Sequence, residues 1–232
     1  MGEKNMRRVG IIGGMGPLAT IDLYKKIVKL TKANCDQENI PLVIDNNTII
    51  PDRPSYILDY TKPNPLPDLI QSANRLKNAG CEAICLACNT AHYFVDDIIK
   101  QTGVKVLDMP KITVNSILKD VKNVKNICVL ATNVTISTGI YEKELNKNGL
   151  NSVKLSKQIQ EKLMSCIYNG VKAGKVAKYT NLFEEIVNSL EADLFLAACT
   201  ELPIFLPLIK TDKKFMDPTL ELAKEIIKFS RG

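Results

Sequence analysis

The chain alternates short apolar runs with longer amphipathic stretches, and it goes through this alternation twice. Strand–helix alternation of this kind predicts parallel sheets covered by helices, which is an α/β fold. The expected strands are residues 9–12, 42–44, 83–87, 104–107, 127–130 and 194–197. The expected helices are one that begins at Pro17, then 68–79, 91–101, 112–120, 136–148, two within 156–190, and 218–229.

The two halves of the chain have similar spacing. A glycine-rich turn at Gly14 precedes Cys88 by 74 residues, and a second loop at Thr132 precedes Cys199 by 67 residues. We therefore expect two pseudosymmetric lobes, each a parallel sheet flanked by helices, with the active site in the cleft between them. The expected lobes are residues 1–109 and 110–217, with the helix 218–232 crossing back to the first lobe.

Composition places the 232 residues among ordinary globular chains, with 45% hydrophobic and 24% charged residues. No apolar run approaches the roughly 18 residues that a membrane span needs. The basic start at residues 1–8 lacks the form of a signal peptide. Seven cysteines without an export signal favour reduced thiols over a disulfide framework. We expect a cytoplasmic protein without a membrane partner.

The net charge is +6, from 31 Lys and Arg against 25 Asp and Glu. The lysines are scattered along the expected helices and form no basic run with interleaved aromatic residues, so no nucleic-acid partner is expected. A mild positive field suits a small acidic substrate, although solvated lysine faces explain the same charge equally well.

Two cysteines occupy matching places in the two halves. Cys88 and Cys199 each close a buried apolar run, and each is followed by small polar residues that indicate the start of a helix. The positive end of a helix helps a thiol to ionise. Two such thiols facing one another across a cleft could remove a proton from one side of a carbon and return one from the other side. The pair predicts a racemase that needs no cofactor.

Two alternatives compete with this hypothesis. Cysteines 81, 85 and 88 form a C-x3-C-x2-C pattern typical of metal sites, but a strand over 83–87 would point neighbouring side chains to opposite faces. Residues 14–19 fit the degenerate G-x-G-x-x-A dinucleotide pattern, with Asp45 as a candidate ribose ligand. Pro17 weakens that pattern because it removes a backbone N–H from the turn. An isolated cysteine is most often a buried small hydrophobe, as we expect for Cys81, Cys85, Cys128 and Cys166.

Other polar residues are candidates for supporting roles. Arg53, held between two prolines, could bind a carboxylate with two hydrogen bonds or could simply pair with a surface acid. His92 and Glu201 follow the two cysteines closely and could support or orient them, although packing or capping roles explain both equally well. Lys172 is one lysine among many, and spacing alone does not select it.

Several motifs together resemble the aspartate/glutamate racemase family, and the resemblance covers nearly the full chain. It is closer to aspartate racemases than to cell-wall glutamate racemases. The motifs are Gly13-Gly14-Met15-Gly16-Pro17-Leu18-Ala19-Thr20, Pro51-Asp52-Arg53, Cys88-Asn89-Thr90-Ala91-His92, Ala131-Thr132 and Cys199-Thr200-Glu201-Leu202-Pro203.

The resemblance implies a PLP-independent, metal-free racemase of aspartate or glutamate, with two α/β lobes and usually a homodimer. It implies Cys88 and Cys199 as the acid and base, and Arg53 and Lys172 as ligands of the substrate carboxylates. It also implies hydrogen bonds to the substrate from Asn89, Thr90, Ala91, Thr132 and Thr200, with Asp52, His92 and Glu201 supporting the site.

Two positions depart from the family pattern and bear on specificity. Asn39 stands where relatives often have histidine, and Pro54 follows Arg53 where threonine is common. The same scaffold also serves isomerases and decarboxylases of other small acids, and a non-catalytic amino-acid-binding protein would share the motifs. Two cysteines favour racemisation over decarboxylation, because decarboxylation needs only one proton donor.

Overall fold

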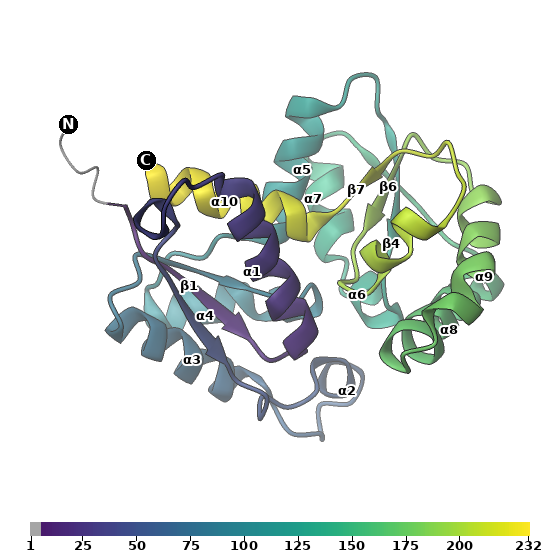
Figure 1. The fold of residues 1–232 in the computed structure, drawn as a ribbon. Helices are drawn as coiled ribbons and strands as arrows, with labels where there is room; N and C mark the ends of the chain where they lie inside the picture. The colour runs from purple at the N-terminus through teal and green to yellow at the C-terminus, as the bar shows by residue number, and fades with distance from the viewer. Residues whose placement is uncertain (1–5) are drawn as a thin grey trace. The chain divides into compact units, whose positions relative to one another are not determined.

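The computed structural model describes residues 6–232, so the expectation about the N-terminal segment rests in part on residues outside the described range. The chain divides into two compact units. Unit 1 comprises the residues up to 112 together with 219–232, and unit 2 comprises residues 113–218. Each unit is built around its own parallel sheet (Figure 1).

The sheet of unit 1 has the order β2-β1-β3. Its strands are β1 (Val9–Gly13), β2 (Leu42–Asn46) and β3 (Ala83–Leu86), all parallel. The expected fourth strand at 104–107 is wrong as a strand, because only Val106 pairs with the sheet, in a single parallel bridge to Ile84. Two hydrogen bonds make this bridge, from the Ile84 N–H to the Lys105 carbonyl and from the Leu107 N–H to the Ile84 carbonyl, and α5 begins two residues later at Met109.

Helices cover both faces of this sheet (Figure 1). One buried cluster joins a face of the sheet to α3 and α4 through Leu76 and Ile98, and a second joins the other face to α1 and α10 through Ile27 and Ile226. The helical segments are α1 (Pro17–Thr31), η1 (Asp36–Glu38), α2 (Arg53–Leu58), α3 (Leu66–Asn78), η2 (Thr90–Phe94), α4 (Val95–Thr102) and α10 (Pro218–Arg231).

The sheet of unit 2 has the order β5-β4-β6-β7, again all parallel. Its strands are β4 (Asn126–Leu130), β5 (Asn151–Val153), β6 (Leu194–Ala197) and β7 (Phe215–Met216). The two outer strands have only three and two residues, which is too short for a periodic pattern in the sequence.

Helices also cover both faces of the unit 2 sheet, with α8, η3 and α9 on one face and α5 and α7 on the other. The single helix expected at 136–148 is wrong, because Gly139 adopts a positive φ of 65° and separates α6 from α7. The helical segments are α5 (Met109–Asp120), α6 (Asn133–Ser137), α7 (Ile140–Lys147), α8 (Lys157–Ser165), η3 (Cys166–Lys172), α9 (Val176–Asn188), η4 (Leu202–Ile204) and η5 (Leu206–Leu208).

The two sheets share one topology. In unit 1 the chain runs from β1 to β2 on one side and returns to β3 on the other, and in unit 2 it runs from β4 to β5 and returns to β6. A parallel sheet binds ligands where such connections diverge, beyond the carboxyl ends of the two inner strands. The topology therefore directs attention to the loops after β1 and β3, and to those after β4 and β6.

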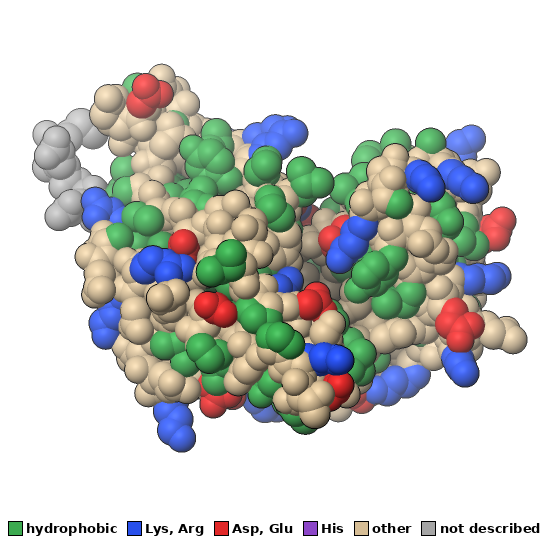
Figure 2. All heavy atoms as spheres, turned by 90° about the horizontal axis from the view of Figure 1, so that it is seen from below, with side chains coloured by type: hydrophobic (Ala, Val, Ile, Leu, Met, Phe, Trp, Pro, Cys, Tyr) green, Lys and Arg blue, Asp and Glu red, His purple; other side chains and the backbone are tan. Residues whose placement is uncertain are grey.

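Two further properties of the described residues bear on possible partners: the hydrophobicity of the helices and the distribution of charge on the surface. Within residues 6–232, no helix combines the length and apolarity needed to cross a membrane. Figure 2 shows Lys and Arg side chains spread over the face in view rather than gathered into one patch.

Candidate functional site

Cys88 and Cys199 lie at equivalent positions of the two sheets. The last register pairs between the inner strands are Ile12 with Leu86 in unit 1 and Leu130 with Ala197 in unit 2. Each cysteine follows its pair by two residues, and both side chains are buried, at 8% and 7% exposure. Two residues beyond the same pairs on the partner strands β1 and β4 lie Gly14 and Thr132. Each thiol therefore lies in one of the two neighbouring loops that leave the sheet where the chain connections run to opposite sides.

The segments after the two cysteines differ from the expected helix starts. Cys88 is followed by the 3₁₀ segment η2, and α4 begins only at Val95. Cys199 is followed by the three-residue 3₁₀ segment η4. The predicted lowering of the thiol pKa by a helix is wrong for Cys199, because burial, followed by the nearby Glu201 carboxylate, raises the pKa of Cys199 well above its usual value.

The glycine-rich loop after β1 has a fixed shape. Gly14 has a φ of +85°, and a Cβ on this residue would come within 2.5 Å of the Asn47 backbone, so only glycine fits. Its N–H donates to Thr20 Oγ1 at 3.0 Å, which joins the loop to α1. Asp45 accepts hydrogen bonds from Arg75, the closer one at 2.7 Å. A loop amide and the acid that a dinucleotide would use are thus already engaged, so these residues do not fit the dinucleotide alternative.

Arg53 begins α2 and turns back onto its own loop. Its Nη1 donates to the carbonyls of Ile50 and Pro51, and its Nη2 donates to the carbonyl of Met15 in the glycine-rich loop, at 3.0 to 3.2 Å. A guanidinium has five N–H donors, so two are left. One is the Nε–H, which is buried and has no hydrogen-bond partner among the described residues. Arg53 is therefore held in place with two donors to spare, the number that a carboxylate accepts in a bidentate contact.

Asp52 fixes the helix turn from which Arg53 extends. Its Oδ2 accepts hydrogen bonds from the backbone N–H of Ser55 at 2.8 Å and from the Ser55 hydroxyl at 2.7 Å. This is the N-cap contact of α2. The predicted supporting role of Asp52 is thus a capping contact rather than a contact with Arg53 itself.

His92 is buried and contacts backbone rather than the thiol. Its Nδ1 lies 2.8 Å from the carbonyl oxygen of Cys88, and its Nε2 lies 3.2 Å from the backbone nitrogen of Met109. A carbonyl can only accept and a backbone N–H can only donate, so Nδ1 carries the proton and the ring is neutral. Burial lowers the pKa of His92, in keeping with that neutral form. His92 therefore joins the Cys88 loop to the start of α5.

The remaining predicted residues of unit 1 follow Cys88 directly. Asn89, Thr90 and Ala91 are all buried. Cys88 and Ala91 belong to the same buried cluster as Met15, whose carbonyl holds Arg53, and Tyr56 of α2 packs against that cluster. Unit 1 thus supports the Cys88 loop, the glycine-rich loop and the Arg53 helix on one apolar base.

Unit 2 gathers three predicted residues around the carboxylate of a fourth, Glu201. The thiol of Cys199 donates to Glu201 Oε2 at 2.9 Å, and the hydroxyl of Thr200 donates to the same oxygen at 3.0 Å. Lys172 Nζ lies 3.8 Å from Glu201 Oε1 and 4.6 Å from the centre of the Tyr168 ring. Cys199, Thr200, Glu201 and Lys172 therefore form one polar group, although the sequence spaces them by up to 29 residues.

Lys172 reaches this group because it ends η3, a π-helical segment that continues α8. Cys166 and Ile167 of η3 are buried in the cluster that also contains Cys199 and Leu202. Short π-helical segments widen a helix and often occur at functional sites. The turn presents the last residue, Lys172, to Glu201.

Thr132 caps α6 at the carboxyl end of β4. Its Oγ1 accepts from the Thr135 N–H and lies 3.0 Å from the Thr135 hydroxyl. Gln160 of α8 donates to the carbonyl of Ala131 at 2.9 Å. Thr132 is among the predicted residues and Thr135 is not, because the cap uses the Thr135 backbone N–H, which does not depend on the residue type.

A comparison with known protein families matches residues 12–226 to the model of the Asp/Glu/hydantoin racemases. The chain belongs to the Asp/Glu/hydantoin racemase family. This confirms the predicted family and assigns the chain to the amino-acid racemases of the Asp/Glu type, which are isomerases.

Individual members of the family are similar over nearly the whole chain. The aspartate racemase of Picrophilus torridus has 30% sequence identity and a TM-score of 0.82, over 97% of this chain and 94% of that one. The broad specificity amino-acid racemase RacX of Bacillus subtilis is 28% identical over 94% of this chain and 96% of its own. A putative Asp/Glu racemase from Yersinia pestis, at 22% identity and a TM-score of 0.84 over 97% and 99% of the two chains, shares the fold. The two solved structures confirm the predicted α/β fold class.

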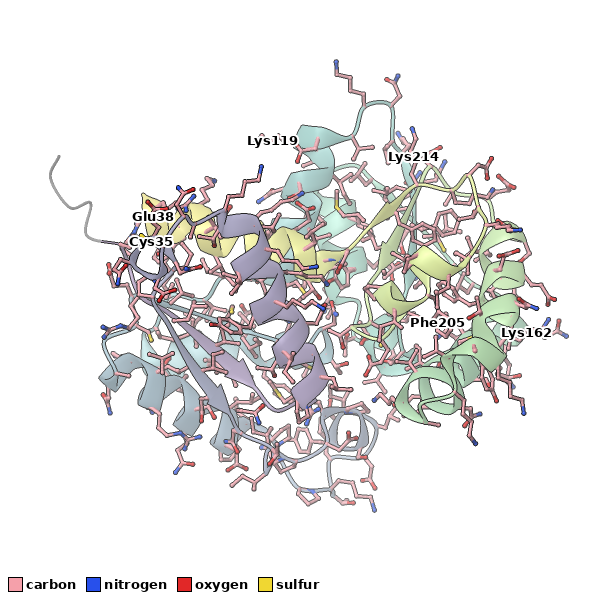
Figure 3. The ribbon with its side chains drawn as sticks, viewed as in Figure 1. Cys35, Glu38, Lys119, Lys162, Phe205 and Lys214 are labelled. Atoms are coloured by element: carbon pink, nitrogen blue, oxygen red, sulfur yellow. The ribbon has the colours of Figure 1, made fainter. Side chains whose placement is uncertain are left out.

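The other cysteines of this racemase-family chain lie away from the loops that carry Cys88 and Cys199. Cys85 lies in the cluster on the opposite face of the unit 1 sheet from Cys81 and Cys88, as strand alternation predicts. Burial raises the pKa of Cys128 to about 12 and that of Cys166 to about 11. Cys35 is exposed in the loop that also carries Glu38 (Figure 3).

Within the described part of the chain, no three His, Cys, Asp or Glu side chains converge in a group that could hold a metal ion. The three residues of the C-x3-C-x2-C pattern are divided between two faces of a sheet. The donor set that the pattern would require is therefore not assembled.

The structure also identifies supporting residues that the sequence did not single out. Thr20 holds Gly14, Met109 donates to His92, and Tyr168 lies against the Lys172 ammonium. Tyr168 precedes Lys172 by four residues, a spacing that places two side chains on one face of a helix. The other two contacts join segments that are distant or irregular, and no sequence pattern marks them.

Proposed function

We propose that this protein interconverts L- and D-aspartate, with glutamate as the second candidate, by a two-base mechanism in which Cys88 and Cys199 act on opposite faces of one α-carbon. The observation that carries the proposal is the equivalence of the two buried thiols, each two residues beyond the last register pair of its sheet. A thiol pair of this kind is suited to a reaction that is the same in both directions.

The groups around the thiols suit an acidic amino acid. Arg53 has two spare N–H donors for a carboxylate, and Lys172 offers a half-exposed ammonium for the other carboxylate. Hydrogen bonds around the α-carboxylate and amino group would come from Asn89, Thr90, Ala91, Thr132 and Thr200. Similarity to the aspartate racemase of Picrophilus torridus favours aspartate as the first substrate to test.

The proposed reaction exchanges one proton for another. One cysteine, as the thiolate, removes the α-proton and becomes a thiol, while the other thiol donates its proton to the opposite face and becomes a thiolate. The α-hydrogen of an amino acid is very weakly acidic, so the carbanion needs stabilisation from fixed positive charge and N–H donors in a site that excludes water. Arg53 and Lys172 supply the charge in this proposal.

The proposal includes a reaction without cofactor, carried out by a homodimer in the cytoplasm. Free thiols at Cys88 and Cys199 fit a reducing compartment. Light scattering of the purified protein tests the assembly, and a mass equal to one chain would contradict the homodimer.

The first experiment is proton NMR of L-aspartate, and then of L-glutamate, in D₂O with the reduced protein and no added cofactor, with chiral analysis of the product. Loss of the α-proton signal together with the D-enantiomer supports the racemase. Exchange without inversion means that one thiol acts alone. Substrate binding without exchange indicates a binding protein, and neither binding nor exchange indicates a different small acid.

Cys88→Ala and Cys199→Ala should each abolish racemisation, because each variant lacks one of the two proton carriers. We expect a fall of at least about 10³-fold in kcat, in the range that general acid–base groups contribute. Cys35→Ala and Cys166→Ala are matched controls and should retain activity. Appreciable racemisation in both directions by Cys88→Ala or by Cys199→Ala would refute the assignment of these two cysteines as the acid and the base.

A further inference from the structure

We infer that Glu201 is a positioning residue that holds the proton of Cys199, so that the two thiols of the proposed racemase begin in unequal states. Cys199 rests as the thiol, which is the state that donates a proton to the enantiomer whose α-proton faces Cys88. The opposite enantiomer requires Cys199 to give up its proton first. The inference rests on the proposed function, and it adds a division of labour that the pair of cysteines alone does not imply.

The geometry of unit 2 carries this inference. The Sγ of Cys199 lies 2.9 Å from Glu201 Oε2, and a carboxylate can only accept, so the proton belongs to the sulfur. Thr200 donates to the same oxygen and fixes its position. Ionisation of Cys199 would remove the donated hydrogen bond and bring a second negative charge against the carboxylate. The contact therefore favours the protonated thiol.

Two charged groups face Cys199 within the described residues, and they act in opposite directions. Glu201 raises the pKa of the thiol and Lys172 lowers it, while burial raises it further. Glu201 is the nearer group, because Lys172 contacts the far carboxylate oxygen at 3.8 Å. The net effect agrees with the direction set by the hydrogen bond.

The two halves of the chain differ at this position. Glu201 follows Cys199 by two residues, and the residue that follows Cys88 by two is Thr90, which carries no charge. The inner-strand registers and the two thiols match, but an acid at this spacing occurs in one half only. The contact that favours the protonated thiol is thus a feature of unit 2.

Lys172 links this proton to substrate binding. In the structure its ammonium pairs with Glu201, and in the proposed function it binds a substrate carboxylate. A substrate carboxylate that engages Lys172 takes up part of the positive charge that offsets Glu201. Cys199, in contact with Glu201, then holds its proton more firmly. The carbanion takes this proton from Sγ once it has formed. The thiol becomes a thiolate, and the proton is now on the α-carbon.

The direct test is the titration of Cys199 in the full-length protein. Alkylation by iodoacetamide is followed against pH, with mass spectrometry of the Cys199 and Cys88 peptides from the same samples. Glu201→Gln should lower the apparent pKa of Cys199 by about one unit or more, because it removes a like charge in contact with the thiol. The Cys88 profile should not move. Glu225→Gln, which changes a partly buried acid paired with Lys228 in α10, is the matched control.

A merely structural role of Glu201 predicts a different result. Loosening of the loop would change the alkylation rate of Cys199 by a similar factor at every pH, without moving the midpoint. An unmoved midpoint in Glu201→Gln would therefore overturn the inference. If Glu201→Gln does not fold, Glu201→Asp keeps the charge on a shorter side chain, and its midpoint should stay closer to that of the wild type than the midpoint of Glu201→Ala.

Kinetics supply a second readout. The equilibrium constant of a racemisation is one, so kcat/KM must be equal for the two enantiomers at every pH. A difference between the two thiols can then be detected only in the separate constants. The kcat values of the two enantiomers differ, and the KM values differ by the same factor. Glu201→Gln should move the kcat ratio of the two enantiomers toward one, by up to about tenfold for one pKa unit, with the KM ratio following.

A wild-type kcat ratio of one, or a ratio that Glu201→Gln leaves unchanged, would overturn the division of labour. Failure of the proposed function is a separate result, because the alkylation profile needs no activity. If the protein shows no racemase activity but the alkylation midpoint of Cys199 shifts in Glu201→Gln, the role of Glu201 in holding the proton stands and the proposed racemase function fails.

Discussion

A single buried histidine joins the Cys88 loop to the next element of unit 1. His92 gives the Cys88 carbonyl a donor and gives the Met109 N–H an acceptor, and the residue is 7% exposed. Both backbone groups lose this hydrogen bond when the ring is removed, and an unsatisfied buried group costs about 1–3 kcal/mol. His92 is therefore a stabilising residue at the site rather than a proton carrier.

His92→Ala should lower the free energy of unfolding by about 3 kcal/mol at pH 7.5. The difference from the wild type should narrow at pH 5.5. Urea unfolding at the two pH values measures both effects, and His92→Gln, which can restore only one of the two hydrogen bonds, should lie between the wild type and His92→Ala. A difference that is equal at the two pH values would contradict the neutral buried ring.

The sign of this pH effect follows from the lowered pKa of His92 in the folded state. The unfolded chain takes up a proton on this histidine near its ordinary pKa of about 6.5, whereas the folded chain does so only at lower pH. The unfolded state thus binds more protons below pH 6.5, and the stability that the neutral ring contributes is present above that pH and lost as the pH falls. The alanine variant has no such group to titrate.

At the scale of elements, α2 holds Arg53 and packs only partly buried side chains, Tyr56 and Ile57, against the core. The helix has six residues and none of them is buried, so its N-cap contact with Asp52 is a large part of what orders it. Loss of an N-cap costs about 1 kcal/mol, which corresponds to roughly a fivefold effect.

Asp52→Ala should therefore lower kcat/KM for aspartate by about fivefold, through an Arg53 that is less well ordered, while the melting temperature changes little. Asp52→Asn, which keeps a capping oxygen, should retain most of the activity. Steady-state kinetics with thermal unfolding of both variants measures the contrast. A large loss of melting temperature in Asp52→Ala would instead place α2 in the stabilising core.

The elements that the sequence predicted well are those whose own residues decide their structure. Strand β6 matches its predicted bounds of 194–197, because all four of its residues are buried. The helix that begins at Pro17 also has the predicted start. The strands β5 and β7 and the bridge at Val106 depend on neighbouring strands, and the break at Gly139 depends on one backbone angle.

For the candidate site, the sequence predicted which residues belong to it but not the contacts that these residues make. The motifs identified the two cysteines, Arg53 and Thr132 by residue type and spacing. They could not indicate that Arg53 binds three carbonyls of its own unit, or that the thiol of Cys199 donates to Glu201. Such contacts depend on loop conformations that residue patterns do not encode.

At the scale of the whole molecule, unit 1 is completed by a segment that is distant in sequence. Helix α10 packs into the cluster of α1 and β1 with Leu222, Ile226 and Phe229, and Ser230 donates to the carbonyl of Arg7 at 2.7 Å. Burial of three such side chains contributes roughly 5–9 kcal/mol. That is comparable to the total stability of a typical domain, about 5–15 kcal/mol.

A chain truncated after Asp217 should therefore lose the structure of unit 1 and keep that of unit 2. Hydrogen exchange followed by mass spectrometry should show loss of amide protection in β1 and β3, with protection retained in β4 and β6. Full-length Glu225→Gln is the control, because it alters α10 only at an ion pair on its exposed side. Retained protection in β1 would contradict the role of α10 in unit 1.

The position of helix α10 at the end of the chain also determines the order in which the two units can be completed during synthesis. Synthesis proceeds from the N-terminus at about 5–20 residues per second. Residues 113–218, which form unit 2, have all been made before the last segment of unit 1 exists. The nascent chain must therefore carry the uncovered side of β1 and α1 through the synthesis of the other unit, and these apolar surfaces are the ones that a chaperone would meet first.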